Sequence, residues 1–243
     1  MLLTIDIGNT NITFGLFKSN KLFRVFNIPT KSYNIGELKK KLGKAKFNDT
    51  IICSVVPKTT HLLSSDLRRL TKIKPCVVGK DIIVPIKNCY RKPKQVGQDR
   101  LVNAFAGVKL YGSPLVVVDF GTAVTFDVIS GKGEYLGGMI IPGLGVSLDA
   151  LSKYTALLPM VKLESPREFI GRDTKNSMLS GVVYGYAALC DDLSARIKLK
   201  VGVKAKIIGT GGNVGLIGKY CKSLDKIDKD LTLFGLNLLN KRS

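Results

Sequence analysis

The sequence of 243 residues contains one histidine, His61, and no tryptophan. A single imidazole leaves little material for a histidine-rich metal site or for Ser-His catalysis. The five cysteines are widely spaced and form no CxxC pair, so the sequence predicts neither a disulfide framework nor a zinc site. We expect a cytoplasmic protein whose thiols stay reduced.

Long apolar runs and the common nucleotide-binding loops are also missing. The most apolar window, 136–148, is interrupted by glycine and proline, which argues against a membrane span. Asp6 interrupts the apolar N-terminus, which is not typical of a signal peptide. No GxGxxG motif occurs, and segment 212–220 lacks the first glycine and the Ser/Thr of a P-loop. Any nucleotide must therefore bind to another kind of loop.

Acidic residues are few beside basic ones: 18 Asp and Glu stand against 38 Lys and Arg, a formal net charge of +20. Such an excess raises the hypothesis of a nucleic-acid binder. The basic residues are spread over the chain, however, and the dense patches at 39–46 and 198–206 lack interleaved aromatic residues that could stack on bases. We therefore expect neither a nucleic-acid nor a membrane partner, but a positive field that favours anionic small molecules.

The first 17 residues predict a strand, a tight polar turn and a second strand. Residues 2–7 are apolar apart from Thr4 and Asp6, as in a strand buried on both faces. Gly8 permits a sharp turn, and amide and hydroxyl side chains follow it. Two interpretations are open: a phosphate cradle beside a metal-binding carboxylate, or an ordinary hairpin stabilised by Asp and Asn.

The same order of features returns at residues 115–129. An apolar strand leads to Asp119, one residue, Gly121, a polar turn and an alternating strand. This internal repeat favours the phosphate-cradle interpretation. It predicts an α/β fold of two related domains, residues 1–112 and 113–243, whose acidic turns face a shared cleft where a small ligand binds.

Periodicity predicts the remaining elements. Helices are expected at 34–42, 59–70, 101–110, 145–154, 175–198 and 231–239, and strands at 21–29, 49–56, 75–78, 135–141 and 204–209. Asp99 and Arg100 thus lie at the N-terminus of the helix 101–110. Asp99 is either a helix cap or a general base that points into the cleft.

Four blocks of sequence resemble the type III pantothenate kinases, of the acetate and sugar kinase, Hsp70 and actin superfamily. The blocks are Asp6-x-Gly8-Asn9-Thr10, Gly97-x-Asp99-Arg100 with Asn103, Asp119-x-Gly121-Thr122-Ala123-x-Thr125-x-Asp127, and Gly137-Gly138-x-Ile140-x-Pro142-Gly143 with Thr155-Ala156-x-Leu158-Pro159. Shorter matches at 170–181 and 210–212 extend the resemblance over nearly the whole chain. The first block is shared across the superfamily, whereas the second and fourth are more specific.

The resemblance implies two ribonuclease-H-like domains and ATP-dependent phosphorylation of pantothenate to 4'-phosphopantothenate, the first step of coenzyme A biosynthesis. It also implies a homodimer that uses Mg²⁺ and a monovalent cation, K⁺ or NH₄⁺. The alternative is a nucleotide-binding accessory or regulatory protein of the same fold, which would not need the base in the second block.

The resemblance further implies a role for individual residues. Asp99 would be the general base, Asp119 would bind the monovalent cation, and Asp6 would lie near Mg²⁺. The pantothenate site would be formed by Tyr90, Gly97, Gln98, Asp99, Arg100 and Thr174. The ATP phosphates would be bound by Asp6, Ile7, Gly8, Asn9, Thr10, Asn11, Ile12, Thr13 and Thr122.

Overall fold

The computed structural model describes residues 1–240. These residues form two compact units. Unit 1 comprises Met1–Ile86, Lys92–Ala106 and the C-terminal segment from Leu231 onward, and unit 2 comprises Lys87–Arg91 and Gly107–Asp230. None of the helices in this part of the chain combines the length and apolar character needed to cross a bilayer.

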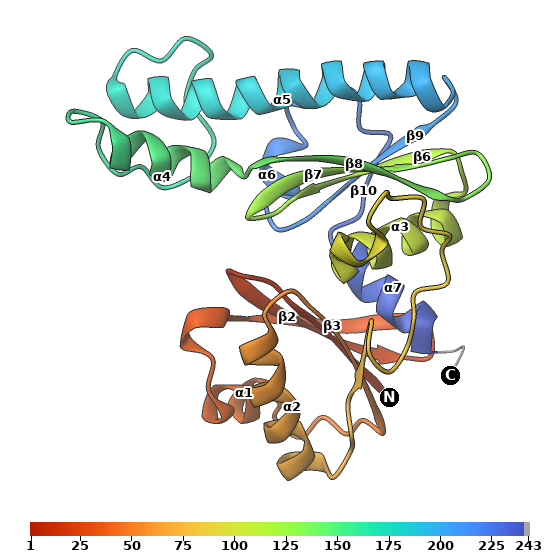
Figure 1. Ribbon diagram of the computed structural model, residues 1–243. Helices are drawn as coiled ribbons and strands as arrows, with labels where there is room; N and C mark the ends of the chain where they lie inside the picture. Colours follow the sequence, from red (N-terminus) through yellow and green to blue (C-terminus); the bar gives the residue numbers. More distant parts are fainter. Residues whose placement is uncertain (241–243) are drawn as a thin grey trace. The chain divides into compact units, whose positions relative to one another are not determined.

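Unit 1 is built on a five-stranded mixed sheet in the order β3-β2-β1-β4-β5 (Figure 1). The central strand β1 pairs antiparallel with β2 and parallel with β4. The strands are β1 (Leu2–Ile7), β2 (Asn11–Lys18), β3 (Lys21–Pro29), β4 (Asp49–Ser54) and β5 (Cys76–Val77).

Alternation along β1 explains how helices cover this sheet. Leu3, Ile5 and Ile7 are fully buried in one core with side chains of α1 (Ile35–Leu42) and α2 (Pro57–Thr71). Each such aliphatic side chain contributes about 1.5–3 kcal/mol through burial. The alternate residues, including Thr4 and Asp6, lie on the other face, where α7 (Leu231–Asn240) packs on β1 and β4.

Unit 2 has a second five-stranded sheet, in the order β10-β9-β6-β7-β8. Its central strand β6 pairs antiparallel with β7 and parallel with β9. The strands are β6 (Leu115–Phe120), β7 (Ala123–Ile129), β8 (Tyr135–Pro142), β9 (Lys206–Thr210) and β10 (Lys226–Ile227).

Helices cover both faces of the second sheet. Val116, Val118 and Phe120 face a core shared with α4 (Leu144–Tyr154), α5 (Thr174–Val201) and α6 (Val214–Ile217). Figure 1 shows the long helix α5 running across this face. On the other face lies the end of α3 (Gln98–Tyr111), where a Cβ added at Gly107 would come within 2.6 Å of the Leu115 side chain.

The two sheets confirm the predicted internal repeat. Strands β3-β2-β1-β4-β5 correspond in order and direction to β8-β7-β6-β9-β10. Asp6 and Asp119 are each the fifth residue of a six-residue central strand, and each is partly exposed between fully buried neighbours. They pair across the sheet with Thr13 and Thr125 respectively. The fold class is therefore the predicted one: two related α/β units.

The two units do not follow the predicted division at residues 112 and 113. The C-terminal helix α7 belongs to unit 1, because Leu233, Leu236 and Leu239 are buried there against the sheet that begins the chain. Segment 87–91 belongs to unit 2, because the Cys89 amide donates to the Tyr135 carbonyl at 2.8 Å. Such distant partners leave no periodic signal in the sequence.

Most predicted helices and strands are present, with changed ends. Helix α3 begins at Gln98 rather than 101, because the Leu101 amide donates to the Gly97 carbonyl at 3.3 Å. Asp99 therefore lies inside the first helical turn. Helix α2 begins at Pro57, since proline suits the first helical position. The short elements β10 and α6 were not predicted.

Candidate active site

The turn between β1 and β2 is closed by its own backbone and braced by the end of β3. The Gly8 amide donates to the Asn11 carbonyl at 3.0 Å. Thr30, directly after β3, donates its amide to the Thr10 carbonyl at 2.9 Å and its hydroxyl to the Gly8 carbonyl at 2.7 Å. The turn is thus held rigid while Asn9 and Thr10 remain exposed at its tip. Rigid backbone with exposed polar groups is suited to anion binding.

Two residues of the predicted phosphate site have buried side chains. Ile7 and Ile12 are fully buried, pair with each other across the sheet and belong to the core of unit 1. Only their backbone atoms are available to a ligand. The side chains of Asp6 and Thr13 are partly exposed on the opposite face of the same two strands.

Asp99 lies in the first turn of α3, against the α-carbon of Gly97. A Cβ at Gly97 would overlap the Asp99 Oδ1 atom, so any larger residue there would displace that carboxylate. That oxygen accepts the Arg100 amide at 2.9 Å. Burial raises the pKa of Asp99, and the amide and positive charge of Arg100 oppose the shift in part. A carboxylate with a raised pKa at the positive end of a helix is well suited to accept a proton.

Asp6 and Asp99 are brought near a common neighbour, Cys53. Cys53 is opposite Asp6 in the parallel pairing of β1 with β4, and its side chain is fully buried. Burial raises the pKa of its thiol, and the negative charges of Asp6 and Asp99 raise it further. Cys53 therefore remains a neutral thiol beside two carboxylates, at one end of the unit 1 sheet.

The residues that flank Asp99 have packing roles in unit 1. The Gln98 side chain lies against Gly79, where a Cβ would come within 2.7 Å of the Gln98 Cδ atom. Arg100 is 8% exposed, so its guanidinium is held within the protein rather than in solvent. The buried Asn103 accepts a hydrogen bond from the Thr232 hydroxyl at 2.7 Å, which joins α3 to α7.

The second acidic turn, between β6 and β7, is packed against two glycines from elsewhere in unit 2. Gly211 has φ of +93°, and a Cβ there would overlap the Asp119 Oδ1 atom. Gly143, directly after β8, donates its amide to the Thr122 carbonyl at 2.9 Å. A Cβ at Gly143 would overlap the same carbonyl oxygen. Close backbone packing therefore fixes Asp119 and leaves the Thr122 side chain exposed.

The brace on each turn occupies the same place in the repeat. Pro29 ends β3 and Pro142 ends β8, and the next residue in each case donates its amide to the neighbouring turn. The sequence already contains the matching pairs Ile28-Pro29 and Ile141-Pro142. This correspondence could have been found by aligning the two halves beyond their first hairpins.

Tyr90 and Thr174 lie in unit 2. Tyr90 is half-buried on a segment that pairs with β8, and a Cβ added at Gly137 would come within 3.2 Å of its ring. Thr174 is exposed at the first position of α5, after the N-cap Asp173, whose side chain accepts the Asn176 amide at 2.8 Å. The start of a 28-residue helix favours a negative ligand group such as a carboxylate.

The predicted site residues thus fall into two groups, each held by its own unit. Unit 1 contains the first turn together with Gly97, Gln98, Asp99 and Arg100, and unit 2 contains Tyr90, Asp119, Thr122 and Thr174.

Comparison with known proteins identifies the family. Residues 2–196 match the family model described as type III pantothenate kinase. Type III pantothenate kinases of Anaeromyxobacter dehalogenans and of Geobacter sp. strain M21 are each 40% identical to the chain. In both cases the alignment covers the whole of both proteins. The chain belongs to the type III pantothenate kinase family.

As a pantothenate kinase, the chain acts at the first step of coenzyme A biosynthesis. Membership of a kinase family also implies ATP and a divalent metal ion.

Solved structures support the fold of the kinase. A Campylobacter jejuni protein described as a Baf family transcriptional activator has a TM-score of 0.62 at 23% identity, covering 99% of this chain and 98% of its own. A Sinorhizobium meliloti protein described as a 2-dehydro-3-deoxygalactonokinase has a TM-score of 0.58 at 11% identity, covering 100% and 99%. At these identities the likeness shows the two-unit kinase fold and nothing more.

The kinase's acidic turns offer the donors that a divalent ion would need. Asp6, Asn9 and Thr13 present oxygen atoms that are partly or fully exposed, and oxygen is the ligand that Mg²⁺ prefers. Asp119 and Thr125 provide a similar set of oxygen donors in unit 2. The residues present therefore fit hard cations.

One buried polar group of the pantothenate kinase had no role assigned from the sequence. Asp127 is fully buried and accepts hydrogen bonds from the Tyr135 hydroxyl at 2.9 Å and the Thr125 hydroxyl at 3.1 Å. It connects Thr125, the strand partner of Asp119, to Tyr135, whose ring centroid lies 6.5 Å from that of Tyr90. The two-residue alternation along β7 placed Thr125 and Asp127 on one face and could have revealed this connection.

Proposed function

We propose that Asp99 is the general base of the pantothenate kinase reaction and accepts the proton of the pantothenate hydroxyl. Three observations support this role: its place in the first turn of α3, its contact with Gly97, and the pKa that burial raises. Arg100 attracts the substrate carboxylate into the same region. Of these, the partly exposed carboxylate in the first turn of α3 is the observation that carries the proposal.

We propose that the ATP phosphates bind to the turn from Asp6 to Thr13 and to Thr122. The exposed Asn9 and Thr10 side chains and the backbone of the turn would donate to phosphate oxygens, and Ile7 and Ile12 would contribute backbone atoms alone. Asp6 would hold the divalent ion, and Asp119 would hold a monovalent cation, K⁺ or NH₄⁺. These cations offset the negative charge of the transferring phosphoryl group.

We propose that Tyr90, Gly97, Gln98 and Thr174 complete the binding of pantothenate. Thr174 offers a hydroxyl and the positive end of α5, and Tyr90 offers a half-buried ring and a hydroxyl. Gly97 and Gln98 act by position, since Gly97 leaves room for Asp99 and Gln98 packs on Gly79. These residues orient the substrate hydroxyl, and orientation supplies a large share of catalysis in phosphoryl transfer.

Phosphate transfer from ATP to pantothenate, measured in K⁺ and in Na⁺, tests the function and the cation together. We expect 4'-phosphopantothenate to form at a higher rate in K⁺ than in Na⁺. A chain that binds ATP and forms no product in either salt would instead be an accessory protein of the same fold. Equal rates in the two salts would remove the role proposed for a monovalent cation.

We propose that the kinase is a cytoplasmic homodimer, with the interface on unit 2. The segment between α4 and α5 carries apolar side chains in solvent: Leu157 is 91% exposed, Met160 85% and Ile170 76%. Several strongly exposed apolar residues on one short stretch of chain are typical of a protein interface. The neighbouring Tyr154 and Phe169 are also exposed and would enlarge that surface.

Replacing Leu157 and Met160 together with glutamate is expected to convert the dimer to a monomer, because two buried charges would have no partners. Analytical ultracentrifugation measures the change. The matched control replaces Leu199 and Val203 with glutamate, since these are also exposed, at 77% and 73%, near the other end of α5. A monomeric wild-type protein, or a control that dissociates equally, would contradict the proposed interface.

A further inference from the structure

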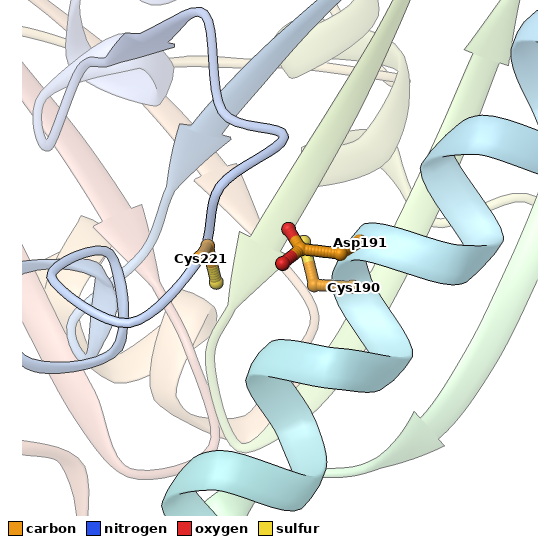
Figure 2. Close-up of side chains that lie close together, drawn as sticks. All are labelled: Cys190, Asp191 and Cys221. Atoms are coloured by element: carbon orange, nitrogen blue, oxygen red, sulfur yellow. The ribbon is translucent and has the colours of Figure 1, made fainter.

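Two cysteines and a carboxylate lie together in unit 2, and none of the three is assigned to the kinase reaction. The Sγ atoms of Cys190 and Cys221 and a carboxylate oxygen of Asp191 all lie within 4.8 Å of one another. Figure 2 shows Cys190 and Asp191 on α5 and Cys221 on the segment that follows α6. Within residues 1–240, no other group of three potential ligands from Cys, His, Asp and Glu is this close.

The surroundings make this a built site with one open side. Cys190 is fully buried in the core of unit 2, so its sulfur is held by packing. Asp191 and Cys221 are partly exposed, which leaves access for an ion and for a water molecule. The three ligands come from two separate elements, α5 and the segment 221–223.

Hydrogen bonds already orient Asp191 toward the second element. Its Oδ1 atom accepts the amides of Lys222 at 2.9 Å and Ser223 at 2.8 Å. Its Oδ2 atom accepts one hydrogen bond from the described residues, from the Lys222 amide at 3.1 Å. A carboxylate oxygen has two lone pairs, so Oδ2 can also bind a cation.

Cys190 is also near the second element through a polar contact, since its sulfur lies 3.8 Å from the Ser223 hydroxyl oxygen. Zinc binds cysteine as the thiolate, so an ion held by both sulfurs would displace both thiol protons.

We propose that Cys190, Asp191 and Cys221 bind one thiophilic divalent cation of the Zn²⁺ class, with water as the fourth ligand. Zinc–sulfur bonds of about 2.3 Å and zinc–oxygen bonds of about 2.0–2.2 Å place tetrahedral ligands roughly 3.5–3.8 Å apart, so the group must contract by about 1 Å. The ion ties segment 221–223 to α5. It is distinct from the cations of the kinase reaction, which take oxygen ligands.

Cadmium provides a direct probe of the thiolates. The reduced full-length protein, freed of metal with a chelator, is titrated with Cd²⁺ while the sulfur-to-metal charge-transfer absorption is followed. We expect saturation at one equivalent and displacement by Zn²⁺. Cys221→Ser should abolish the signal, whereas Cys76→Ser, which removes a partly exposed cysteine of unit 1, should leave it unchanged. An unchanged signal in Cys221→Ser would overturn the proposal.

A second measurement on the wild-type protein does not depend on the folding of a variant. Zn²⁺ at 100-fold above its Kd should raise the unfolding temperature by about 5 °C and protect Cys221 from alkylation, as mapped by mass spectrometry. Kinase activity with and without Zn²⁺ at this site should be equal. No protection of Cys221, or a Cys190–Cys221 disulfide that persists in reductant, would overturn the metal site.

Discussion

Replacing Asp99 with asparagine is expected to lower kcat by about 10²–10⁴-fold, the contribution typical of a general base. The change keeps the shape of the side chain and its contact with Gly97, so the fold should persist. Steady-state phosphorylation of pantothenate measures the loss, and thermal unfolding checks the fold. Wild-type turnover in the purified variant would remove Asp99 from the role of base.

The sign of the pH dependence follows from the raised pKa of Asp99. The base acts when ionised, so kcat/KM should fall as the pH drops through that raised pKa, above the value of about 3.9 typical of an aspartate. When the pKa of a carboxyl is higher in the folded state, the stability that this group contributes to the protein is lost as the pH rises through its folded-state pKa. Asp99→Asn should therefore unfold at the same or a higher temperature than the wild type at neutral pH.

The matched control is Glu37→Gln. Glu37 also lies in the first turn of a unit 1 helix, α1, so its loss tests the general effect of removing an acid near a helix N-terminus. We expect its turnover to equal that of the wild type. A comparable loss of turnover in both variants would mean that helix stability, and not proton transfer, explains the effect of Asp99→Asn.

Asp6→Asn and Asp119→Asn are expected to lower kcat by about 10²–10³-fold each, but to change different cation requirements. Asp6→Asn should raise the Mg²⁺ concentration needed for half-maximal rate by about 10–100-fold, as loss of a metal partner does. Asp119→Asn should raise the K⁺ requirement and leave the Mg²⁺ requirement unchanged. Titration of each cation at a saturating level of the other measures both shifts.

A control for this pair is Asp49→Asn. Asp49 lies on β4 and pairs with Leu2, whereas Asp6 lies near the opposite end of β1 and pairs with Cys53. Neither cation requirement should therefore change in Asp49→Asn. If Asp6→Asn altered the K⁺ requirement and Asp119→Asn the Mg²⁺ requirement, the two proposed roles would be exchanged. If both variants altered both requirements equally, the carboxylates would act on a common ion.

The internal repeat was predictable because each copy is defined by residues that are close together in the sequence. Each half begins with an apolar strand, an aspartate, a glycine and a polar turn, and two such hairpins fold alike wherever they stand. The start of α3 was less predictable: Gln98, Asp99 and Arg100 are polar and show no helical periodicity, although a backbone bond to Gly97 begins the helix before them. Apolar periodicity reveals the buried face of a helix, and these three residues precede the first apolar residue of that face, Leu101.

The sequence by itself determined the family, the two related α/β units and the two acidic turns, because these depend on short-range pattern and on motif spacing. Only the tertiary structure decided the rest. It joined α7 to the first sheet, placed Cys53 near both Asp6 and Asp99, and packed Gly211 against Asp119. Such contacts join residues far apart in the chain, and their side chains become neighbours only when burial of the apolar strands brings the elements together.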